Sequence, residues 1–465
     1  MTPLLPAHPH PSCGPGLALH DLAATRRLEA RALALHPDLM QQAGLAVAKL
    51  ALVLRQGAGP VWVVCGPGHN GGDGRVAAHL LQQQGVPVAL TDAAPANPSL
   101  AIDALLGIGL NRAPSELMLA NIAALQACGA PILAVDLPSG LLADTGQPAG
   151  GHAKSAVRAD HTLTLLTLKP GLFTGEGRAH AGRIWFDDLG VSNDEPASLD
   201  LLGPLEPQAL PVRLPTAHKG SHGQVLVVGG GPGMEGAARL AARAALACGA
   251  GRVYLDLLGA APNEAADPGQ PELMRGQRAR LPQAVGVLGC GAGDAIAAAL
   301  PGLLAGLPRL VIDADALNAL AADSALQALL RARPAGHSLI TPHPLEAARL
   351  LGCSTAAVQA DRVAAARALA ARLACTVILK GSGSVIASPG QRPAINPSGG
   401  PALATAGSGD VLAGWLGGLW AQAPDISADR IARAGVFEHG RAGETPGVLR
   451  ASALIERLAG LPPAR

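Results

Sequence analysis

Cys65 to Gly74 reads Cys-Gly-Pro-Gly-His-Asn-Gly-Gly-Asp-Gly, and it comes directly after the apolar run 61–64. A glycine-rich turn between a strand and a helix exposes backbone N–H groups at the helix N-terminus, where the helix dipole favours a phosphate. Glycine also tolerates the unusual dihedrals and the close approach of a ligand that such a turn needs. The stretch therefore predicts a phosphate-binding turn in a βα unit, with the helix following Gly74.

Short apolar runs alternate with helical stretches on both sides of this turn. The expected strands of the N-terminal half are 61–65, 86–90, 101–105, 131–135 and 162–167. Those of the C-terminal half are 224–228, 284–288, 310–312, 338–341 and 376–379, with a helix over 236–248 and a run at 384–388 that could pair with the preceding strand. This alternation is typical of parallel βαβ units, so both halves are expected to be α/β, with ligands at the carboxyl ends of the strands.

Less regular sequence lies outside this pattern. Residues 1–18 are rich in Pro, Gly and His and are expected to be disordered, and a helical pattern starts near Leu19 and runs past Leu50. Residues 191–217 contain several prolines and no sustained periodicity, which indicates a domain boundary near residue 212. The predicted domains are therefore 1–212 and 213–465, since 465 residues are too many for one ordinary domain.

The composition excludes several classes of protein. With a formal net charge of +1, the chain lacks the clustered Lys and Arg of a nucleic-acid surface. Its seven cysteines are odd in number and include no CxxC pair, which indicates free thiols in a reducing cytosol. Neither a signal peptide nor an uncharged run long enough to span a bilayer is present. We expect a cytoplasmic protein that binds neither nucleic acid nor membrane.

Three strands of the N-terminal half are followed by ionisable residues. Asp103 precedes a turn with two glycines, Asp136 opens the loop Asp-Leu-Pro-Ser-Gly, and Lys169 follows the last expected strand. A lone Asp after a strand is often only a helix cap. Because consecutive βα loops converge on one edge of a sheet, however, these residues favour a site, in which an Asp and a Lys facing one ligand would make an acid/base pair.

With the run 66–74, the Asp103 loop, the run 135–140 and Lys169-Pro170-Gly171, residues 20–190 resemble the NAD(P)H-hydrate epimerase family. The resemblance implies a Rossmann-like three-layer domain that interconverts the R and S forms of hydrated NADH and NADPH. It implies that Asp136 and Lys169 transfer protons. It also implies a potassium ion held by Asn70, Asp103 and Ser139.

The same resemblance implies the residues that bind the hydrate. They belong to the glycine-rich stretch, the loop after Asp103 and the Asp136 loop: His69, Asn70, Gly71, Gly72, Asp73, Gly107, Ile108, Gly109, Leu110, Asn111, Arg112, Ala113 and Asp136. The family usually has Asn where this chain has His69. Since His can still donate to a phosphate, we expect retained binding with an altered pH dependence.

The C-terminal half carries its decisive stretch at 405–414, which reads Thr-Ala-Gly-Ser-Gly-Asp-Val-Leu-Ala-Gly. Gly407 to Gly409 would open an anion site at the N-terminus of the following helix. Asp410 would lie in the first turn, where its carboxylate can take a proton from a substrate hydroxyl as a phosphoryl group arrives. The alternative is that Asp410 only offsets the helix dipole, but two glycines beside it are a poor choice for helix stability alone.

Other segments of this half support a nucleotide site. Glycine-rich turns at 229–236 and 289–293 follow apolar strands. Asp313 and Asp315 stand at a strand end and are candidate magnesium partners through water. Lys380 begins a Lys-Gly-Ser-Gly-Ser turn that offers a cation and backbone N–H groups to a nucleotide.

Together these motifs make residues 213–460 similar to the ADP-dependent NAD(P)H-hydrate dehydratase family, which has the ribokinase-like α/β fold. The resemblance implies that Asp410 meets the hydroxyl of the hydrate, which attacks the terminal phosphate of ADP. AMP leaves, and elimination of phosphate restores the dihydropyridine. The implied pocket residues are Ala237, Gly291, His343 and Asp410 for the hydrate, and Lys380, Gly381, Ser382, Gly383, Ser384 and Gly409 for ADP. Two departures, Leu345 in place of Gly and Gly400 in place of Asn, put fine substrate positioning in doubt.

Two alternatives remain beside this interpretation. The same architecture serves small-molecule kinases for a vitamin or a sugar alcohol, although such kinases have no use for the N-terminal half. The N-terminal half could instead be a non-catalytic binding module, for which His69 is the best support. The two motif sets together favour a bifunctional repair enzyme that acts on NADHX and NADPHX with ADP, Mg²⁺ and K⁺, and that forms a homo-oligomer.

Overall fold

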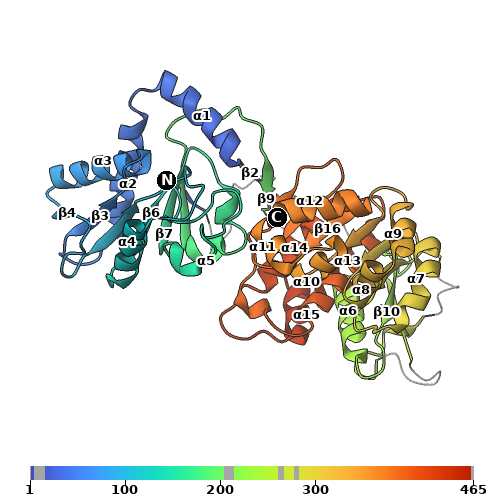
Figure 1. Ribbon diagram of the computed structural model, residues 1–465. Helices are drawn as coiled ribbons and strands as arrows, with labels where there is room; N and C mark the ends of the chain where they lie inside the picture. The colour runs from blue at the N-terminus through green and yellow to red at the C-terminus, as the bar shows by residue number, and fades with distance from the viewer. Residues whose placement is uncertain (1, 5–15, 204–213, 260–266, 277–281, 462–465) are drawn as a thin grey trace. The chain divides into compact units, whose positions relative to one another are not determined.

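The computed structural model describes residues 2–4, 16–203, 214–259, 267–276 and 282–461. They form two compact units that divide between Asp200 and Leu201 (Figure 1). The predicted boundary near residue 212 lies outside the described residues, so its position stays a prediction. Within the described ranges, no helix is both long and apolar enough to cross a membrane.

The first unit is built on a seven-stranded sheet in the order β1-β8-β7-β6-β5-β3-β4. The strands are β1 Thr2–Leu4, β3 Val61–Cys65, β4 Val88–Leu90, β5 Leu100–Ala104, β6 Ile132–Val135, β7 His161–Leu165 and β8 Arg183–Asp187. All pairs are parallel except β1 with β8, which is antiparallel. The helices are α1 Leu22–Leu35, α2 Leu39–Leu54, α3 His69–Gln83, α4 Glu116–Ala127 and α5 Gly177–His180.

Apolar side chains of this sheet alternate between its two faces, as the two-residue period of a strand requires. Val61 and Val63 of β3 pack on one face with residues of α2 and α3. Trp62 and Val64 pack on the other face with residues of α4. The unit therefore has three layers, and the predicted Rossmann-like class is confirmed.

Several local predictions for this unit are wrong. The helical pattern from Leu19 past Leu50 is split into α1 and α2, because Pro37 cannot continue a helix and disfavours helical geometry in the residue before it. Thr2–Leu4 and Leu17–Leu19, expected to be disordered, form the strands β1 and β2, while residues 5–15 lie outside the described ranges. The strand β8 was not expected, because charged residues at both its ends leave only a very short apolar run between them.

Helix α3 begins at His69, and not after Gly74 as predicted. Its glycines allow close packing within a helix. A Cβ on Gly71 would lie 1.9 Å from the carbonyl oxygen of Gly66, and one on Gly74 would lie 2.6 Å from Ala104 Cβ. The stretch expected to be a loop is thus the start of α3, pressed against the carboxyl ends of β3 and β5.

The second unit is built on strands in the order β12-β11-β10-β13-β14-β15-β16-β17-β18. They are β10 Gln224–Gly229, β11 Arg252–Leu257, β12 Met274–Arg275, β13 Val285–Leu288, β14 Arg309–Ile312, β15 Ser338–Ile340, β16 Thr376–Leu379, β17 Val385–Ala387 and β18 Ala394–Ile395. The strands from β12 to β16 are parallel, and β17 is antiparallel to β16, as the sequence suggested. A short strand at the unit boundary is β9 Leu199–Leu201.

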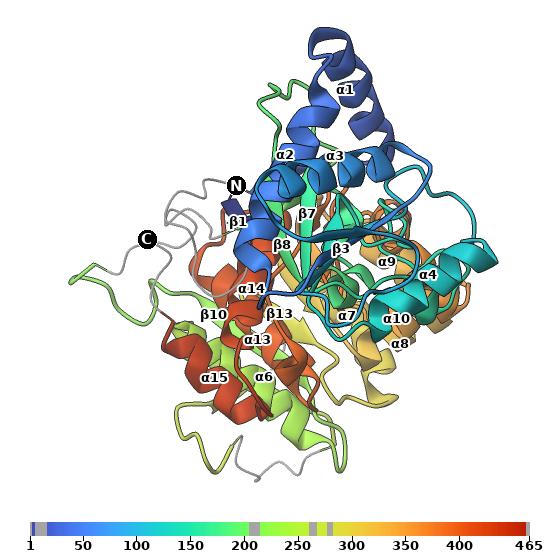
Figure 2. The same ribbon diagram turned by 90° about the vertical axis from the view of Figure 1, so that its left-hand side faces the viewer.

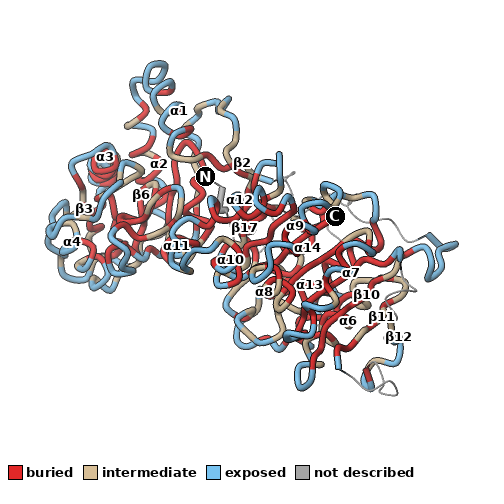
Figure 3. The backbone as a smooth tube through the Cα atoms, turned by 45° about the vertical axis from the view of Figure 1, so that its right-hand side comes forward, coloured by how far each residue is buried: buried red, intermediate tan, exposed pale blue. Residues whose placement is uncertain are grey.

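Ten helices surround these strands in the described part of this unit. They are α6 Glu235–Cys248, α7 Ala295–Gly306, α8 Asp315–Ala322, α9 Ser324–Arg331, α10 Pro344–Leu351, α11 Thr355–Ala360, α12 Arg362–Leu373, α13 Ser408–Gln422, α14 Ala428–Ala442 and α15 Ala451–Ala459. Side chains from α6, α13, α14 and α15 share one core with the strands. Figure 3 shows how the buried residues follow the strands of each unit.

Helix α13 is buried on every side from Val411 to its end and packs along α6 (Figure 2). This contact depends on glycine, because a Cβ on Gly414 would lie 1.9 Å from the carbonyl oxygen of Ala241. Gly414 comes one helical turn after Asp410, on the same face of α13. The packing of α13 on α6 therefore sets where the first turn of α13 lies.

Candidate active sites

A cavity of about 790 Å³ lies in the first unit, where the loops after the parallel strands meet α1, α2 and the start of α3. The structure brings most of the residues predicted for the hydrate site to its wall: His69, Asn70, Asp73, Gly107, Ile108, Gly109, Leu110, Asn111, Arg112, Asp136 and Lys169. Gly71, Gly72 and Ala113 do not line it. Helix α1 contributes wall residues that the sequence did not indicate.

Lys169 and Asp136 form an ion pair at this cavity. The ammonium of Lys169, which is 1% exposed, also donates to the Leu165 carbonyl oxygen at 2.6 Å and to Thr164 Oγ1 at 3.2 Å. Asp136 has a left-handed backbone with φ of +65°, a conformation that residues with a Cβ seldom adopt outside functional sites. The two residues of the predicted acid/base pair are thus in contact, and the ammonium of Lys169 is held by three oxygen atoms.

Asp73 is a third ionisable residue on the wall of the cavity. Burial, with smaller repulsions from Asp136 and Glu29, raises the pKa of Asp73 to about 8. The carboxyl group therefore keeps its proton at neutral pH and can donate a hydrogen bond or a proton to a ligand.

The three residues predicted to hold potassium gather around the loop after β5. Asp103 is fully buried and accepts from Ser139 N at 2.8 Å and Ser139 Oγ at 2.5 Å. Burial raises the pKa of Asp103 to about 6, against the lowering effect of these hydrogen bonds. Leu106 N donates to Ser139 Oγ at 2.8 Å, and a Cβ on Gly107 would lie 3.3 Å from Asn70 Cβ.

Asn70 gives a reason to expect a ligand there. Both polar atoms of its amide are buried and have no hydrogen-bond partner in the structure. A buried polar group without a partner costs free energy, which a bound cation or water would offset. An amide, a carboxylate and a hydroxyl are hard oxygen donors, so the residues fit an alkali cation.

His69, the departure from the family pattern, lies at the mouth of the cavity. Its side chain is 75% exposed, and its Nδ1 lies 3.5 Å from Glu29 Oε1 on α1. A protonated His69 would therefore be shared between Glu29 and any phosphate that binds at the start of α3.

In the second unit, polar residues lie after the adjacent strands β13 to β16. Lys380 follows β16, and its Nζ contacts Asp313 Oδ1, after β14, at 2.6 Å. Burial opposes the charge on Lys380, but the attraction of Asp313 and Glu346 outweighs it and raises the pKa of Lys380. A Cβ on Gly409 would lie 3.4 Å from Lys380 Nζ, so the first turn of α13 meets this ion pair.

Asp410 lies in the first turn of α13, as predicted. Burial and the repulsion of Asp313 raise the pKa of Asp410 to about 6. The residue before the helix is Gly407, which has φ of +86° and no side chain, so it does not cap the N–H groups of the first turn. A carboxylate with a raised pKa and a helix start without a side-chain cap therefore stand next to a lysine.

Three residues around Asp410 and the Lys380–Asp313 pair were not singled out from the sequence. Burial and the nearby carboxylates of Asp410 and Asp313 raise the pKa of the Cys290 thiol, so it stays protonated beside Asp410. The buried His439 of α14 places Nε2 2.9 Å from the Ser408 carbonyl oxygen, and burial lowers its pKa to about 4, so it is neutral and donates there. Burial raises the pKa of Glu346 to about 7. Cys290 lies between two glycines just after a strand, a pattern from which it could have been singled out. His439 lies on a helix and has no such pattern around it.

The remaining predicted residues of this unit occupy loops around the same strand ends. A Cβ on Gly291 would lie 2.8 Å from Ala237 Cβ, so these two residues are in contact. His343 caps α10 by accepting from Leu345 N and Glu346 N, which is a structural role in addition to the predicted one. Gly381 has φ of +141° and packs on Arg362 at the start of the turn that contains Ser382, Gly383 and Ser384.

The two sequence departures have different surroundings. Leu345 is 45% exposed on α10, directly after the helix cap. Gly400 has extended backbone and begins the short 3₁₀ turn Pro401–Leu403. Asp315, the other candidate magnesium partner, accepts from Gly293 N at 2.8 Å.

The two sites described above make this an α/β chain with two candidate active sites. Comparison with known proteins assigns each half to a family. Residues 225–450 match the family model described as NAD(P)H-hydrate dehydratase, and residues 36–97 and 89–171 match that of YjeF-related protein N-terminus. The chain is 36% identical over 452 residues to the bifunctional NAD(P)H-hydrate repair enzyme Nnr of Escherichia coli (strain K12), covering 88% of this chain and 84% of the relative. It is likewise 36% identical to that of Coxiella burnetii, covering 88% and 90%.

The chain belongs to the bifunctional NAD(P)H-hydrate repair enzyme family, and both resemblances inferred from the sequence are confirmed. Among solved structures, it is similar to the ADP/ATP-dependent NAD(P)H-hydrate dehydratase from Bacillus subtilis co-crystallised with ATP and Mg²⁺. That similarity has 26% identity and a TM-score of 0.44, over 54% of this chain and 92% of that one.

Proposed function

We propose that the N-terminal half interconverts the R and S forms of NADHX and NADPHX. We further propose that the C-terminal half dehydrates the S form to NADH or NADPH while ADP is converted to AMP and phosphate. The observation that supports this most directly is Asp410 at the uncapped start of α13, next to the Lys380–Asp313 pair. The proposed domains are 1–212 and 213–465, and we propose a cytoplasmic homo-oligomer.

For the epimerase, the residues on the cavity wall suit proton transfer at a hydroxyl group. In the hydrate the hydroxyl is on a ring carbon bonded to nitrogen, so proton donation to oxygen lets water leave as the nitrogen lone pair forms a C=N bond. Addition of water to the opposite face and loss of a proton then give the other epimer. Asp136 is the proposed base and Lys169 the proposed acid, which their contact at the cavity supports, and Asp73 holds a further proton at neutral pH.

Potassium is proposed to be held by Asn70, Asp103 and Ser139, because the amide of Asn70 has no other partner. When bound, the cation supplies positive charge at the phosphate end of the site. Asp103 holds Ser139 in place through two hydrogen bonds, so these residues orient the loops even before a ligand arrives.

For the dehydratase, Asp410 takes the proton from the hydroxyl of the hydrate as its oxygen attacks the terminal phosphate of ADP. AMP is the leaving group, and the resulting phosphate ester loses phosphate and a ring proton to restore the double bond. Lys380, with Gly409 and the turn Gly381–Ser384, is proposed to bind the nucleotide, and Ala237, Gly291 and His343 the hydrate. Phosphoryl transfer depends mainly on positioning and charge stabilisation, which this arrangement offers.

Magnesium is proposed to be bound through water by Asp313 and Asp315 together with the nucleotide phosphates. Mg²⁺ commonly uses one or two carboxylates and keeps several waters, so the two carboxylates after β14 fit this ion. When bound, it neutralises charge on the phosphates. Lys380 keeps Asp313 oriented through their ion pair.

The direct test is to incubate the full chain with a mixture of both epimers, Mg²⁺, K⁺ and either ADP or ATP. Recovery of the near-ultraviolet absorbance of reduced nicotinamide should be complete with ADP. Recovery of only the S fraction would contradict the proposed epimerase activity and favour a non-catalytic N-terminal module. A stable phosphorylated product in place of restored coenzyme would favour the kinase alternative.

The pKa of Asp410 predicts the acid limb of the dehydratase pH profile. Because burial raises this pKa to about 6, the basic carboxylate is present above pH 6 and is lost below it. We expect kcat/KM for the S hydrate to fall tenfold per pH unit below about pH 6 and to be level from 7 to 8. A decline that starts only near pH 4, the ordinary value for Asp, would contradict the assignment.

Asn70→Ala tests the potassium site. Since the amide has no protein partner, its removal should leave the thermal stability of the chain nearly unchanged. Wild-type epimerisation should rise when K⁺ replaces a large organic cation, and the variant should lose most of this activation. The dehydratase, assayed with pure S hydrate, is the control. Equal activation of wild type and variant would place the cation elsewhere.

A further inference from the structure

Helix α1 forms one wall of the epimerase cavity. Thr25, Arg26, Glu29, Ala30 and Leu33 line it. Glu29 also reaches His69 at the start of α3. The shape of the cavity on this side therefore depends on how firmly α1 is held.

The apolar contact that holds α1 is narrow. Its buried aliphatic residues are Ala24, Leu28 and Ala32, and the last two belong to a small cluster with Leu39 and Leu166. Leu33 and Leu35 are exposed. A helix with so narrow an apolar contact gains little stability from packing, so its position depends on other interactions.

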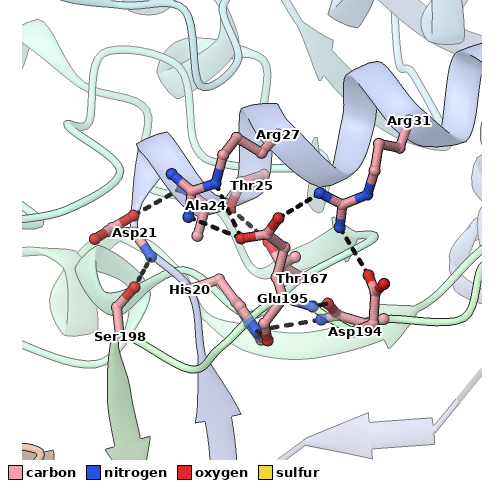
Figure 4. Close-up of polar contacts among 11 residues, drawn as sticks. His20, Asp21, Ala24, Thr25, Arg27, Arg31, Thr167, Asp194, Glu195 and Ser198 are labelled. Atoms are coloured by element: carbon pink, nitrogen blue, oxygen red, sulfur yellow. Dashed lines mark hydrogen bonds and ion pairs between the residues drawn. The ribbon is translucent and has the colours of Figure 1, made fainter.

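Charged side chains supply those interactions on the side of α1 that the segment 193–198 covers (Figure 4). Arg27 Nη2 contacts Glu195 Oε2 at 2.7 Å, and Arg31 bridges Glu195 and Asp194. Glu195 is only 6% exposed, whereas Asp194 is 80% exposed. Hydrogen bonds from Arg27 and Arg31 lower the pKa of Glu195 to about 2, so the cluster stays charged at any pH at which the enzyme is assayed.

The segment 193–198 is itself fixed. Glu195 N donates to Asn193 Oδ1 at 3.0 Å, and the Glu195 carbonyl oxygen lies 3.2 Å from His20 Nε2. Asp21 N, just before α1, donates to Ser198 Oγ at 3.2 Å. Glu195 is therefore a rigid partner for the two arginines.

A second contact joins α1 to the loop that carries Lys169. Thr25 Oγ1 and Thr167 Oγ1 are 2.8 Å apart and buried. The Thr167 carbonyl oxygen accepts from Thr164 Oγ1 at 3.2 Å, and Thr164 Oγ1 in turn contacts Lys169 Nζ. The position of α1 is thus connected to the proposed acid/base pair through two hydroxyl groups.

We propose that the segment 193–198 is a clamp that holds α1 against the cavity, with Glu195, Arg27 and Arg31 as positioning residues for hydrate binding. This inference rests on the epimerase function proposed above. None of the three touches Asp136 or Lys169 in the described contacts, and the separate Thr25–Thr167 contact stays in place when the clamp is removed, so we expect the clamp to act on hydrate binding more than on proton transfer. The side chains of Arg27 and Arg31 are 57% and 45% exposed, so solvent weakens their ion pairs with Glu195, and we expect the loss of the clamp to show in KM more than in global stability.

The test uses the full chain with Glu195→Gln. Epimerisation of the R hydrate is followed by coupling to an excess of the full chain with Lys169→Met, which supplies dehydratase activity without epimerase activity, and α1 is followed by amide hydrogen exchange. We expect KM for the R hydrate to rise roughly tenfold, the factor expected for loss of charge-assisted hydrogen bonds, with kcat within about twofold. Amides of α1 should exchange faster, while those of α2 and α3 keep their protection. Glu195→Asp should be intermediate.

Matched controls distinguish the effect of losing the clamp from a general loss of stability. Glu116→Gln is the same change at an exposed position of α4 and should leave KM and exchange unchanged. The variant's own turnover of pure S hydrate should equal that of wild type. An unchanged KM and unchanged α1 exchange would overturn the proposal, as would faster exchange throughout α1, α2 and α3. If the wild type does not interconvert the epimers, the proposed function fails, whereas the exchange of α1 still decides whether the clamp exists.

Discussion

Asp410→Asn is expected to abolish the repair of S hydrate almost completely, with kcat lower by about 10²–10⁴-fold, the usual contribution of a positioned general base. The amide keeps the size of the side chain but cannot take the proton of the attacking hydroxyl. ADP should still bind, because Lys380 and the start of α13 are unchanged. The measurement is recovery of dihydropyridine absorbance from pure S hydrate with ADP, together with ADP affinity by calorimetry.

Asp294→Asn is the matched control for this change. Asp294 is an exposed residue before α7, outside the proposed site, and its variant should behave as wild type. Interconversion of the epimers, read by chromatography, should be normal in both variants. Retention of a tenth or more of the wild-type kcat by Asp410→Asn would mean that another group, such as Glu346, is the base.

Lys169→Met is expected to have the second large effect, lowering epimerisation by about 10²–10⁴-fold while repair of pure S hydrate stays normal. With a mixture of epimers, absorbance should recover quickly for the S fraction and then only at the spontaneous rate of epimerisation. The physical reason is the loss of the cation that Asp136, Leu165 and Thr164 hold in the cavity.

A structural effect of this change must be separated from the catalytic one. Removing one partner of a buried ion pair costs about 3–5 kcal/mol, because the other charge is left without compensation. The double variant Lys169→Met with Asp136→Asn removes both charges and should regain much of the lost stability in thermal unfolding, yet remain inactive. If the double variant epimerises at the wild-type rate, the pair is not the acid/base couple.

Much of the fold follows from local sequence patterns. Apolar runs bounded by glycine and polar residues predicted the central strands of both units, because buried parallel strands are nearly continuous in Val, Ile and Leu. The strand β8 was missed because its ends are charged, and the start of α3 was misplaced because glycine suggests a loop. The glycines of α3 are required by tertiary packing, because the helix lies close to Gly66 and Ala104. A local sequence pattern does not reveal such contacts.

The candidate sites likewise contain some residues that could be predicted from the sequence and others that could not. Asp136, Asp313 and Lys380 directly follow strands and Lys169 comes shortly after β7, so their meeting at the carboxyl ends could be predicted from topology. Cys290, His439 and Glu195 do not line the cavity, and the residues that each lies against are distant in the chain. Their roles depend on packing between elements, which a single sequence does not reveal. The same holds for α1, whose weak apolar stripe gave no sign that it closes a cavity.

The contact of Gly414 with the Ala241 carbonyl has a consequence for interpreting natural variation in this family. Even alanine at this position would force α13 away from α6, and Asp410, one turn earlier on the same face, would move with it. We expect such a variant to lose dehydratase activity, as a change at the proposed base Asp410 would. A survey that scored variants only by their distance to substrate would classify it as harmless.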